Sequence, residues 1–256
     1  MANVFGIDVS HHNGVIDWQQ VKTSGVKFAI LKCMYEAQSH RIDERFEANY
    51  KGCIDNGIEP GVYIFIASAS IKDPEGDAKA LLKHLKGRAL PLGIWLDYES
   101  GVLRCIGKER IRDLTYIYAD IFRSAGYKVG IYCNKDWYDN VIHTQLKRDF
   151  DFWLARYPRN DAGQYNDNSS LKPKMSGCVA WQYSSKGNVP GIKTKCDLNV
   201  DFGTLCQIGA KKSLEEIAAE VWADKWGKGE ERKARLTAAG YDYEAVRKIV
   251  NVTKPC

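Results

Sequence analysis

The sequence of 256 residues lacks any stretch approaching about 20 apolar residues, so no segment is predicted to span a membrane. It also has no basic leader followed by a long apolar run, and we therefore expect no standard secretion signal. The formal net charge of +5 comes from scattered lysines and arginines, without the dense basic stripe typical of nucleic-acid-binding proteins. These absences predict a soluble globular protein with no membrane span and no nucleic-acid partner.

Metal-ligand patterns are missing as well. The eight cysteines contain no CxxC pair, and the five histidines show no metal-binding spacing. With no secretion signal expected, buried free thiols are favoured over a disulfide framework or a zinc site. We therefore predict neither a metal nor a cofactor. His11 and His12 follow the first predicted strand and are interpreted as part of a surface loop.

Residues 92–99, LGIWLDYE, form a short apolar run between turn residues, which is typical of a β-strand. Because side chains alternate between the two faces of a strand, Trp95, Asp97 and Glu99 are predicted to share one face. The Cα atoms of Asp97 and Glu99 would then lie roughly 6 to 7 Å apart. Two carboxyl groups this close repel one another, so one can stay protonated while the other is ionised. The pair is suited to general acid chemistry, although a strand that merely ends in acidic loop residues gives the same pattern.

Strand-like and helix-like segments alternate along most of the chain. Five strand–helix units in succession predict a parallel sheet, and a closed barrel is the natural solution at this length. Residues 158–176 are rich in Asn, Asp, Ser, Gly and Pro and are predicted to contain no regular helix. Strands are then expected at 179–183 and 197–202 without full helices between them. The predicted fold class is α/β: an irregular (β/α)-barrel of about eight strands that lacks outer helices on its last strands.

Predicted helices in this part of the chain cover residues 41–56, 108–125 and 135–146. In barrels of this kind, functional groups gather at the C-terminal ends of the strands. Residues expected there are Asp8, Tyr63, Phe65, Asp97, Glu99 and Trp153. Carboxylates that accept hydroxyl hydrogen bonds, beside aromatic rings that pack on sugar faces, are typical of carbohydrate binding. Each aromatic residue alone is more often simple core filling, but the combination favours a sugar cleft.

Six ordered motifs carry a family resemblance: residues 5–10 (FGIDVS), 61–65 (GVYIF), 95–99 (WLDYE), 152–157 (FWLARY), 181–183 (WQY) and 197–199 (DLN). In this order and spacing, residues 3–206 resemble the glycoside hydrolase family 25 lysozymes, the Chalaropsis-type muramidases, many of which are phage endolysins. The resemblance implies an endolysin-type N-acetylmuramidase. Its substrate would be the β-1,4 bond between N-acetylmuramic acid and N-acetylglucosamine in bacterial peptidoglycan.

Carried onto matching positions, the resemblance makes Glu99 the general acid and Asp97 the assisting carboxylate. Asp8 and Asp197 become the remaining acids of the site. The residues expected to bind the glycan strand are Tyr63, Phe65, Tyr132, Trp153, Tyr157 and Gln182. Residues 32–36, KCMYE, depart from the Thr-containing segment that the family often has there.

Three routes for opening the glycosidic bond remain open: a protein nucleophile, direct attack by water, or attack by the substrate's own N-acetyl group. We favour the last, because the substrate carries a 2-acetamido group whose N–H Asp97 is placed to hold. In each route Glu99 supplies the proton, and crowding among carboxylates raises its pKa.

The end of the sequence predicts a second unit. Residues 207–212 are predicted to be a linker, and residues 213–256 a small module of three helices. Its segments at 217–222, 225–232 (KWGKGEER), 236–243 (LTAAGYDY) and 246–251 resemble the Cpl-7 type of cell-wall-binding repeat. The resemblance implies muropeptide binding, with ligand candidates Trp226, Arg232, Asp242 and Tyr243, although helix capping and core packing explain these residues equally well. Only one copy of a usually tandem repeat is present, so avidity must come from the catalytic cleft or from self-association.

Two other interpretations are kept. The four acids Asp8, Asp97, Glu99 and Asp197 could ligate a hard cation in a metal-dependent hydrolase, or the barrel could be a non-catalytic wall-binding protein. For a phage endolysin, the expected lack of a secretion signal predicts accumulation in the cytoplasm of the host bacterium. Release by a holin would then deliver the enzyme to the cell wall.

Overall fold

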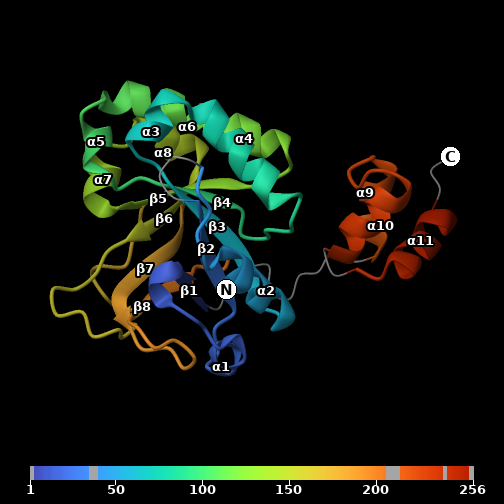
Figure 1. Cartoon of the computed structure of the whole chain (residues 1–256), viewed down its shortest axis with the longest axis horizontal. Coiled ribbons are helices and arrows are strands. Elements are labelled where there is room, and N and C mark those ends of the chain that lie inside the picture. Colours follow the sequence, from blue (N-terminus) through green and yellow to red (C-terminus); the bar gives the residue numbers. More distant parts are fainter. Residues whose placement is uncertain (1–2, 35–39, 206–213, 239–240, 254–256) are drawn as a thin grey trace. The chain divides into compact units, whose positions relative to one another are not determined.

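The computed structural model describes residues 3–34, 40–205, 214–238 and 241–253 (Figure 1). The chain divides into two compact units, residues 1–206 and 207–256. The predicted linker at 207–212 lies outside the described residues. Within the described ranges, every helix is too short or too polar to cross a membrane.

Eight strands of the first unit close into a barrel, each bonded to the next in chain order. They are β1 (Val4–Val9), β2 (Phe28–Met34), β3 (Glu59–Phe65), β4 (Ile94–Asp97), β5 (Val129–Asn134), β6 (Asp151–Ala155), β7 (Cys178–Gly187) and β8 (Cys196–Asp201). This confirms the predicted irregular barrel. Strands β1 to β7 run parallel, but β8 runs antiparallel to both β7 and β1. The connection between β7 and β8, residues 188–195, is shorter than the dozen or more residues that a parallel crossover needs.

Helices cover the parallel part of the barrel (Figure 1). They are α1 (Trp18–Thr23), α2 (Phe46–Asp55), α3 (Ser68–Lys72), α4 (Pro74–Leu85), α5 (Gly101–Arg104), α6 (Gly107–Ser124), α7 (Lys135–Asn140) and α8 (Thr144–Asp149). The predicted helix at 108–125 is confirmed by α6, whose buried stripe includes Ile111, Leu114 and Phe122.

Two helix predictions are wrong in their limits. The helix predicted over 41–56 begins only at Phe46, because Ile42 forms a β-bridge with Met34 and Asp43 continues the pairing with Cys33. The helix predicted over 135–146 is two helices, α7 and α8. His143 ends the first segment in extended backbone and caps the second, accepting the Gln145 N–H through Nδ1 at 3.1 Å.

Alternation along the strands separates two cores. Outward side chains such as Ile94, Leu96 and Tyr98 pack under the helices, whereas Trp95 belongs to a cluster inside the barrel, as the sequence predicts. The interior rings need small neighbours. A Cβ atom at Gly130 would lie 2.3 Å from the ring of Trp95, and one at Gly6 would lie 2.5 Å from the ring of Phe28.

The last strands carry no outer helix. Residues 156–177, all of them described, form the long irregular connection that the sequence predicts. Its Tyr165 and Leu171 pack against Trp181, Tyr183 and Val200 of β7 and β8. The aromatic cluster covers the sheet face that helices cover elsewhere.

The second unit contains α9 (Leu214–Trp222), α10 (Gly229–Ala238) and α11 (Tyr243–Val252), which confirms the three predicted helices. Its core among the described residues consists of six buried side chains: Ile217, Ala218, Val221, Leu236, Val246 and Val250.

The described cysteines are free thiols. Cys33, Cys53, Cys133 and Cys196 are buried, as predicted. The prediction of burial is wrong for Cys105, which is exposed because it follows the short helix α5 at the surface.

Candidate active site

A cavity of about 200 Å³ opens at the C-terminal ends of the parallel strands. Its lining residues are Asp8, Tyr63, Asp97, Glu99, Tyr132, Trp153, Tyr157, Gln182 and Asp197. These are all the residues predicted for catalysis and sugar binding except Phe65. The volume is below the roughly 300–1,000 Å³ of drug-sized ligand sites, so the cavity has the size of a subsite rather than of a whole glycan groove.

Sheet register explains why acids distant in sequence meet here. Asp8 is the last but one residue of the parallel strand β1, and Asp97 is the last residue of β4. Asp197 instead lies at the start of β8, and because that strand runs the other way, it is the cross-strand partner of Asp8. Glu99 follows two residues after β4, in the loop that leads to α5. The antiparallel strand therefore completes an acid cluster that parallel strands alone begin.

Phe65 does not line the cavity, although it shares a strand face with Tyr63. Its ring contacts the Lys32 ammonium group instead, with Nζ 5.6 Å from the ring centroid. The same nitrogen lies 5.9 Å from the ring centroid of Tyr63. Phe65 therefore helps to hold a lysine beside the acids. Of the predicted atypical segment 32–36, residues 35 and 36 lie outside the described residues.

The Asp97 and Glu99 carboxyl groups differ in environment. Burial raises the pKa of Asp97 well above its usual range, the charge of Glu99 adds to this rise, and Lys32 opposes it. The Asp97 Oδ1 atom is buried and has no hydrogen-bond partner among the described residues. Glu99 is exposed at the mouth of the cavity, yet partial desolvation raises its pKa too, again opposed by Lys32. The site thus offers a carboxyl group of raised pKa that substrate can reach.

Asp8 and Asp197 form a second pair. Burial raises the pKa of Asp8 well above its usual range, and the charge of Asp197 raises it further. Burial also raises the pKa of Asp197 to about 6, with Glu99 and Asp161 contributing. The pKa values of all four carboxyl groups that line the cavity are therefore raised above their usual ranges.

Sequence reasoning gave no role to Asn199, which the structure places in the site. This buried residue donates from Nδ2 to Asp8 Oδ2 at 2.8 Å and accepts the Trp153 indole N–H at 2.8 Å. Gln182 donates to the same Asp8 oxygen at 2.7 Å. The signal was present in the sequence, because Asn199 is two residues from Asp197 and therefore shares its strand face.

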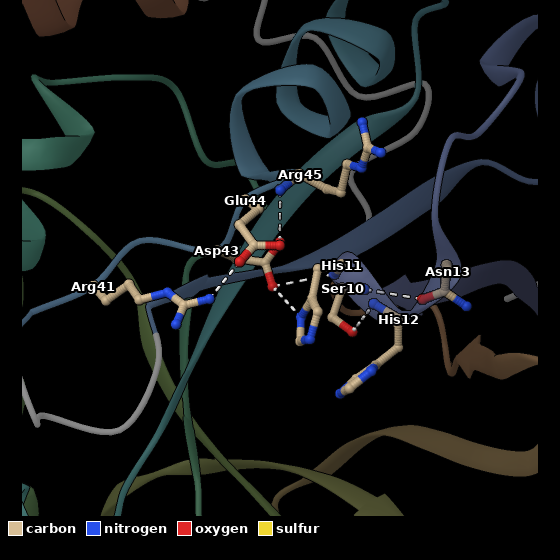
Figure 2. Close-up of polar contacts among 8 residues, drawn as sticks. All are labelled: Ser10, His11, His12, Asn13, Arg41, Asp43, Glu44 and Arg45. Atoms are coloured by element: carbon tan, nitrogen blue, oxygen red, sulfur yellow. Dashed lines mark hydrogen bonds and ion pairs between the residues drawn. The ribbon is translucent and has the colours of Figure 1, made fainter.

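The loop that follows strand β1 is held by a histidine–aspartate contact (Figure 2). Residues His11–Asn13 form a short 3-10 helix after β1, capped by Ser10. Asp43, which is buried, lies 2.9 Å from His11 Nδ1 and also accepts the His11 backbone N–H at 3.1 Å. The contact ties the loop after β1 to the segment after β2, and so fixes the chain that follows Asp8.

Each residue of the C-terminal module that is predicted to bind the muropeptide makes a contact within the module. Asp242 caps α11 by accepting the N–H groups of Glu244 and Ala245. Arg232 donates to the Gly227 carbonyl at 2.8 Å, and Trp226 donates to Glu220 at 3.1 Å. Tyr243 is approached by Lys233, whose Nζ lies 5.9 Å from the ring centroid. These contacts explain the residues structurally and leave their ligand role a prediction.

No group of three or more His, Cys, Asp or Glu side chains in the described part of the chain has an arrangement that could hold a metal ion.

Comparison with known proteins adds two family matches. Residues 7–192 match the family described as Glycosyl hydrolases family 25, and residues 215–253 match the CW_7 repeat. Lysozyme M1 of Streptomyces globisporus is 28% identical over 81% of this chain and 70% of its own length. The lysozyme of Streptococcus phage Cp-7 is 33% identical over 61% of this chain, and the match covers 44% of the phage protein.

Among solved structures, the modular autolysin LytC of Streptococcus pneumoniae, determined with a synthetic peptidoglycan ligand, is similar in fold. Its TM-score is 0.65 at 23% identity, over 77% of this chain and 46% of LytC. At this identity the likeness supports the barrel architecture alone.

Proposed function

Because the chain belongs to glycosyl hydrolases family 25, we propose that this glycoside hydrolase is a muramidase that cleaves the β-1,4 bond after N-acetylmuramic acid in peptidoglycan. The observation that carries the proposal is the convergence of Asp8, Asp97, Glu99 and Asp197 on one open cavity. The named relatives are lysozymes, which supports the substrate class.

In the proposed reaction, Glu99 gives its proton to the glycosidic oxygen as the bond between that oxygen and the anomeric carbon breaks. Partial desolvation raises its pKa, which favours the protonated form that a general acid needs, and its exposure lets the substrate reach it. Positive charge develops at the anomeric carbon, and the neighbouring carboxyl groups stabilise that charge.

We favour participation by the substrate's 2-acetamido group. Its carbonyl oxygen forms a bond to the anomeric carbon as the leaving group departs, giving a cyclic oxazolinium intermediate. Water then attacks the same carbon, the bond between that carbon and the acetamido oxygen breaks, and the water gives a proton to the Glu99 carboxylate, which restores the acid. Support comes from Asp97 Oδ1, a buried acceptor without a partner in the described structure, which the acetamido N–H would satisfy.

The test is the chemistry of the product. Purified cell walls treated with the full chain should show new reducing ends carried by N-acetylmuramic acid. Reducing N-acetylglucosamine ends would indicate a glucosaminidase, and new amino groups without reducing ends an amidase. Wall binding without any product would leave a non-catalytic binding protein. Loss of activity with a chelator, restored by a divalent cation, would favour the metal-dependent alternative.

A substitution at Glu99 tests whether this residue is the general acid. Glu99→Gln should lower turnover by at least about 1,000-fold, since general acid catalysis and the charge of the site are both lost. Binding of wall fragments should persist. Glu75→Gln, which changes an exposed glutamate on α4, is the matched control and should retain full turnover. Substantial residual activity in Glu99→Gln would refute the assignment.

For the C-terminal module we propose muropeptide binding that holds the enzyme on the wall, supported by the CW_7 match. A role as a phage endolysin, acting on the wall after release from the host cytoplasm, is supported by the similarity to the Cp-7 lysozyme. Co-sedimentation with walls at several protein concentrations tests the module and self-association together. Binding that steepens with concentration would indicate self-association.

A further inference from the structure

The hydrogen bonds around Asp8 take no part in the reaction proposed above. Two side-chain amides donate to a single oxygen of this carboxyl group, Oδ2: Gln182 at 2.7 Å and Asn199 at 2.8 Å. All side-chain hydrogen bonds that Asp8 makes in the described structure end on that oxygen.

The orientation of the Asn199 amide is fixed by Trp153. An indole N–H can only donate, and it lies 2.8 Å from Asn199 Oδ1. A flipped amide would place two donors face to face, so Oδ1 must point to the indole and Nδ2 to Asp8. Trp153 is itself held in place by packing against Trp95 and Tyr132 inside the barrel.

Gln182 is oriented in the same sense. Its Oε1 atom accepts the Tyr132 hydroxyl at 2.8 Å and also the Tyr157 hydroxyl, which leaves Nε2 for Asp8. Asn199 and Gln182 are moreover cross-strand partners on β8 and β7. The two amides therefore form one donor surface that faces Asp8.

Two N–H donors on one carboxyl oxygen exclude a proton from that oxygen. When Asp8 binds a proton, the proton must therefore lie on Oδ1. Asp197, the cross-strand partner of Asp8, lines the same cavity. Two anions at these positions repel, and a single proton between them leaves the pair with one negative charge.

Other titratable groups surround Asp8 from neighbouring elements: Tyr63, Tyr132, Tyr157, Cys196, Asp97, Glu99 and Asp197. Burial raises the pKa of the three tyrosines and of Cys196, so these four stay protonated through the neutral range. Among these described groups, the carboxyl groups alone exchange protons there.

We propose that Asn199, oriented by Trp153, is a positioning residue that confines the proton of Asp8 to Oδ1, so that Asp8 and Asp197 act as a pair with one shared proton. The proposal rests on the muramidase function proposed above. It also gives Trp153 a second role, as the anchor of a hydrogen-bond relay beneath the sugar.

The test compares pH profiles of kcat and kcat/KM on soluble peptidoglycan fragments. Trp153→Phe keeps an aromatic ring and removes the N–H, which frees the Asn199 amide to turn. Its basic limb should move up by roughly one pH unit, because Asp8 loses a donor that favours its ionised form. Turnover should fall roughly tenfold with KM little changed, since the proton is no longer confined.

Two further variants complete the cycle. Asn199→Leu should shift the profile in the same direction, and the double variant should shift it no further, because both changes break one relay. Trp137→Phe is the matched control. It makes the same substitution at a buried tryptophan of α7, among the side chains packed under the helices, and its profile should stay that of the wild type.

A measurement without activity separates this proposal from the proposed function. In the full chain labelled with carboxyl-13C aspartate, the Asp8 resonance, assigned from Asp8→Asn, should titrate at higher pH in Trp153→Phe than in the wild type. This readout holds even if the protein cleaves no glycan or Asn199→Leu fails to fold. An unchanged titration of Asp8 in Trp153→Phe, or profile shifts that add in the double variant, would overturn the inference.

Discussion

The barrel buries carboxyl groups at its site, whereas the C-terminal module keeps the residues proposed to bind ligand near the surface. Asp8 and Asp97 are only 6% and 5% exposed, and interior amides hold Asp8 in place. In the module, Asp242 is exposed and Trp226, Arg232 and Tyr243 are partly exposed. Each of the four also makes a contact within the module.

Core size accounts for this difference. A buried carboxyl group costs free energy unless its neighbours compensate, and only a large core can offset that cost. The barrel has an outer core under its helices and a second core inside the sheet. The module has six buried side chains among its described residues, and a core of that size contributes only a few kcal/mol. The residues proposed to bind ligand in the module therefore also support its fold.

The largest expected effect is in the outer core of the barrel. Phe122→Ala on α6 removes a fully buried ring that packs beside Tyr118, and should lower the free energy of unfolding by about 4 kcal/mol. Urea denaturation measures this, and Asp120→Ala on the exposed face of α6 is the control. A loss below about 1 kcal/mol would show that the helical layer matters less than the comparison assumes.

In the C-terminal module, a smaller loss of stability should be enough to unfold the whole unit. Leu236→Ala removes a fully buried side chain of the six-residue core and should cost about 3 kcal/mol, a sum comparable with the whole stability of so small a unit. Calorimetry should show the module transition lost and the barrel transition kept. Thr237→Ala, an exposed neighbour, should change neither. Wall binding should fall, while hydrolysis of soluble fragments persists. Loss of both transitions together would contradict the division into two units of unequal stability.

Local patterns in the sequence were sufficient to predict much of the barrel. The alternation at 92–99 predicts which side chains enter the interior, and the stripe of α6 predicts its limits within one residue. These predictions are confirmed because period and propensity act over neighbouring residues. The nine predicted residues that line the cavity follow from strand parity and from the family resemblance together.

The features that the sequence did not predict correctly depend on contacts between residues that are distant in the sequence. The direction of β8 depends on a short connection and on pairing with β1, which no local period encodes. The late start of α2 depends on bonds from Ile42 and Asp43 to β2. Phe65 has the parity of a cavity residue but packs on Lys32, and Asn199 acquires its role only through Trp153 and Asp8.

The pH dependence of the free energy of unfolding measures the cost of burying the acids. The pKa of Asp197 is raised to about 6 from a usual value of 3.8, so between about pH 4 and 6 the folded state binds more protons than the unfolded chain. The free energy of unfolding therefore falls as pH rises through this window. Asp197→Asn cannot ionise and should stabilise the barrel by on the order of 1 to 2 kcal/mol at pH 7.5, with the gain absent below about pH 4.

An aspartate whose pKa is shifted in the opposite direction is the control for that measurement. Asp167, on the connection over β7 and β8, is exposed, and its pKa is lowered to about 2, chiefly by Lys172, then by Tyr165 and Asn3. Asp167→Asn should destabilise the barrel at pH 7.5, and the loss should shrink as pH falls towards 2. Denaturant midpoints at pH 4, 5.5 and 7.5 compare the two variants. Equal signs for both would contradict the assigned environments.

The smallest expected effect separates the two roles of Asp242. As N-cap of α11 it accepts the N–H groups of Glu244 and Ala245, at 2.8 and 3.1 Å. Asp242→Ala should therefore cost about 1 kcal/mol, whereas Asp242→Asn, an equally good cap, should be close to neutral for stability. The asparagine variant then isolates the charge. If the carboxylate also binds a cationic group of the muropeptide, Asp242→Asn will fold normally and bind walls more weakly in co-sedimentation. If walls are bound as well as by the wild type, Asp242 is a cap alone, and the idea that small modules give one residue both tasks fails at this position.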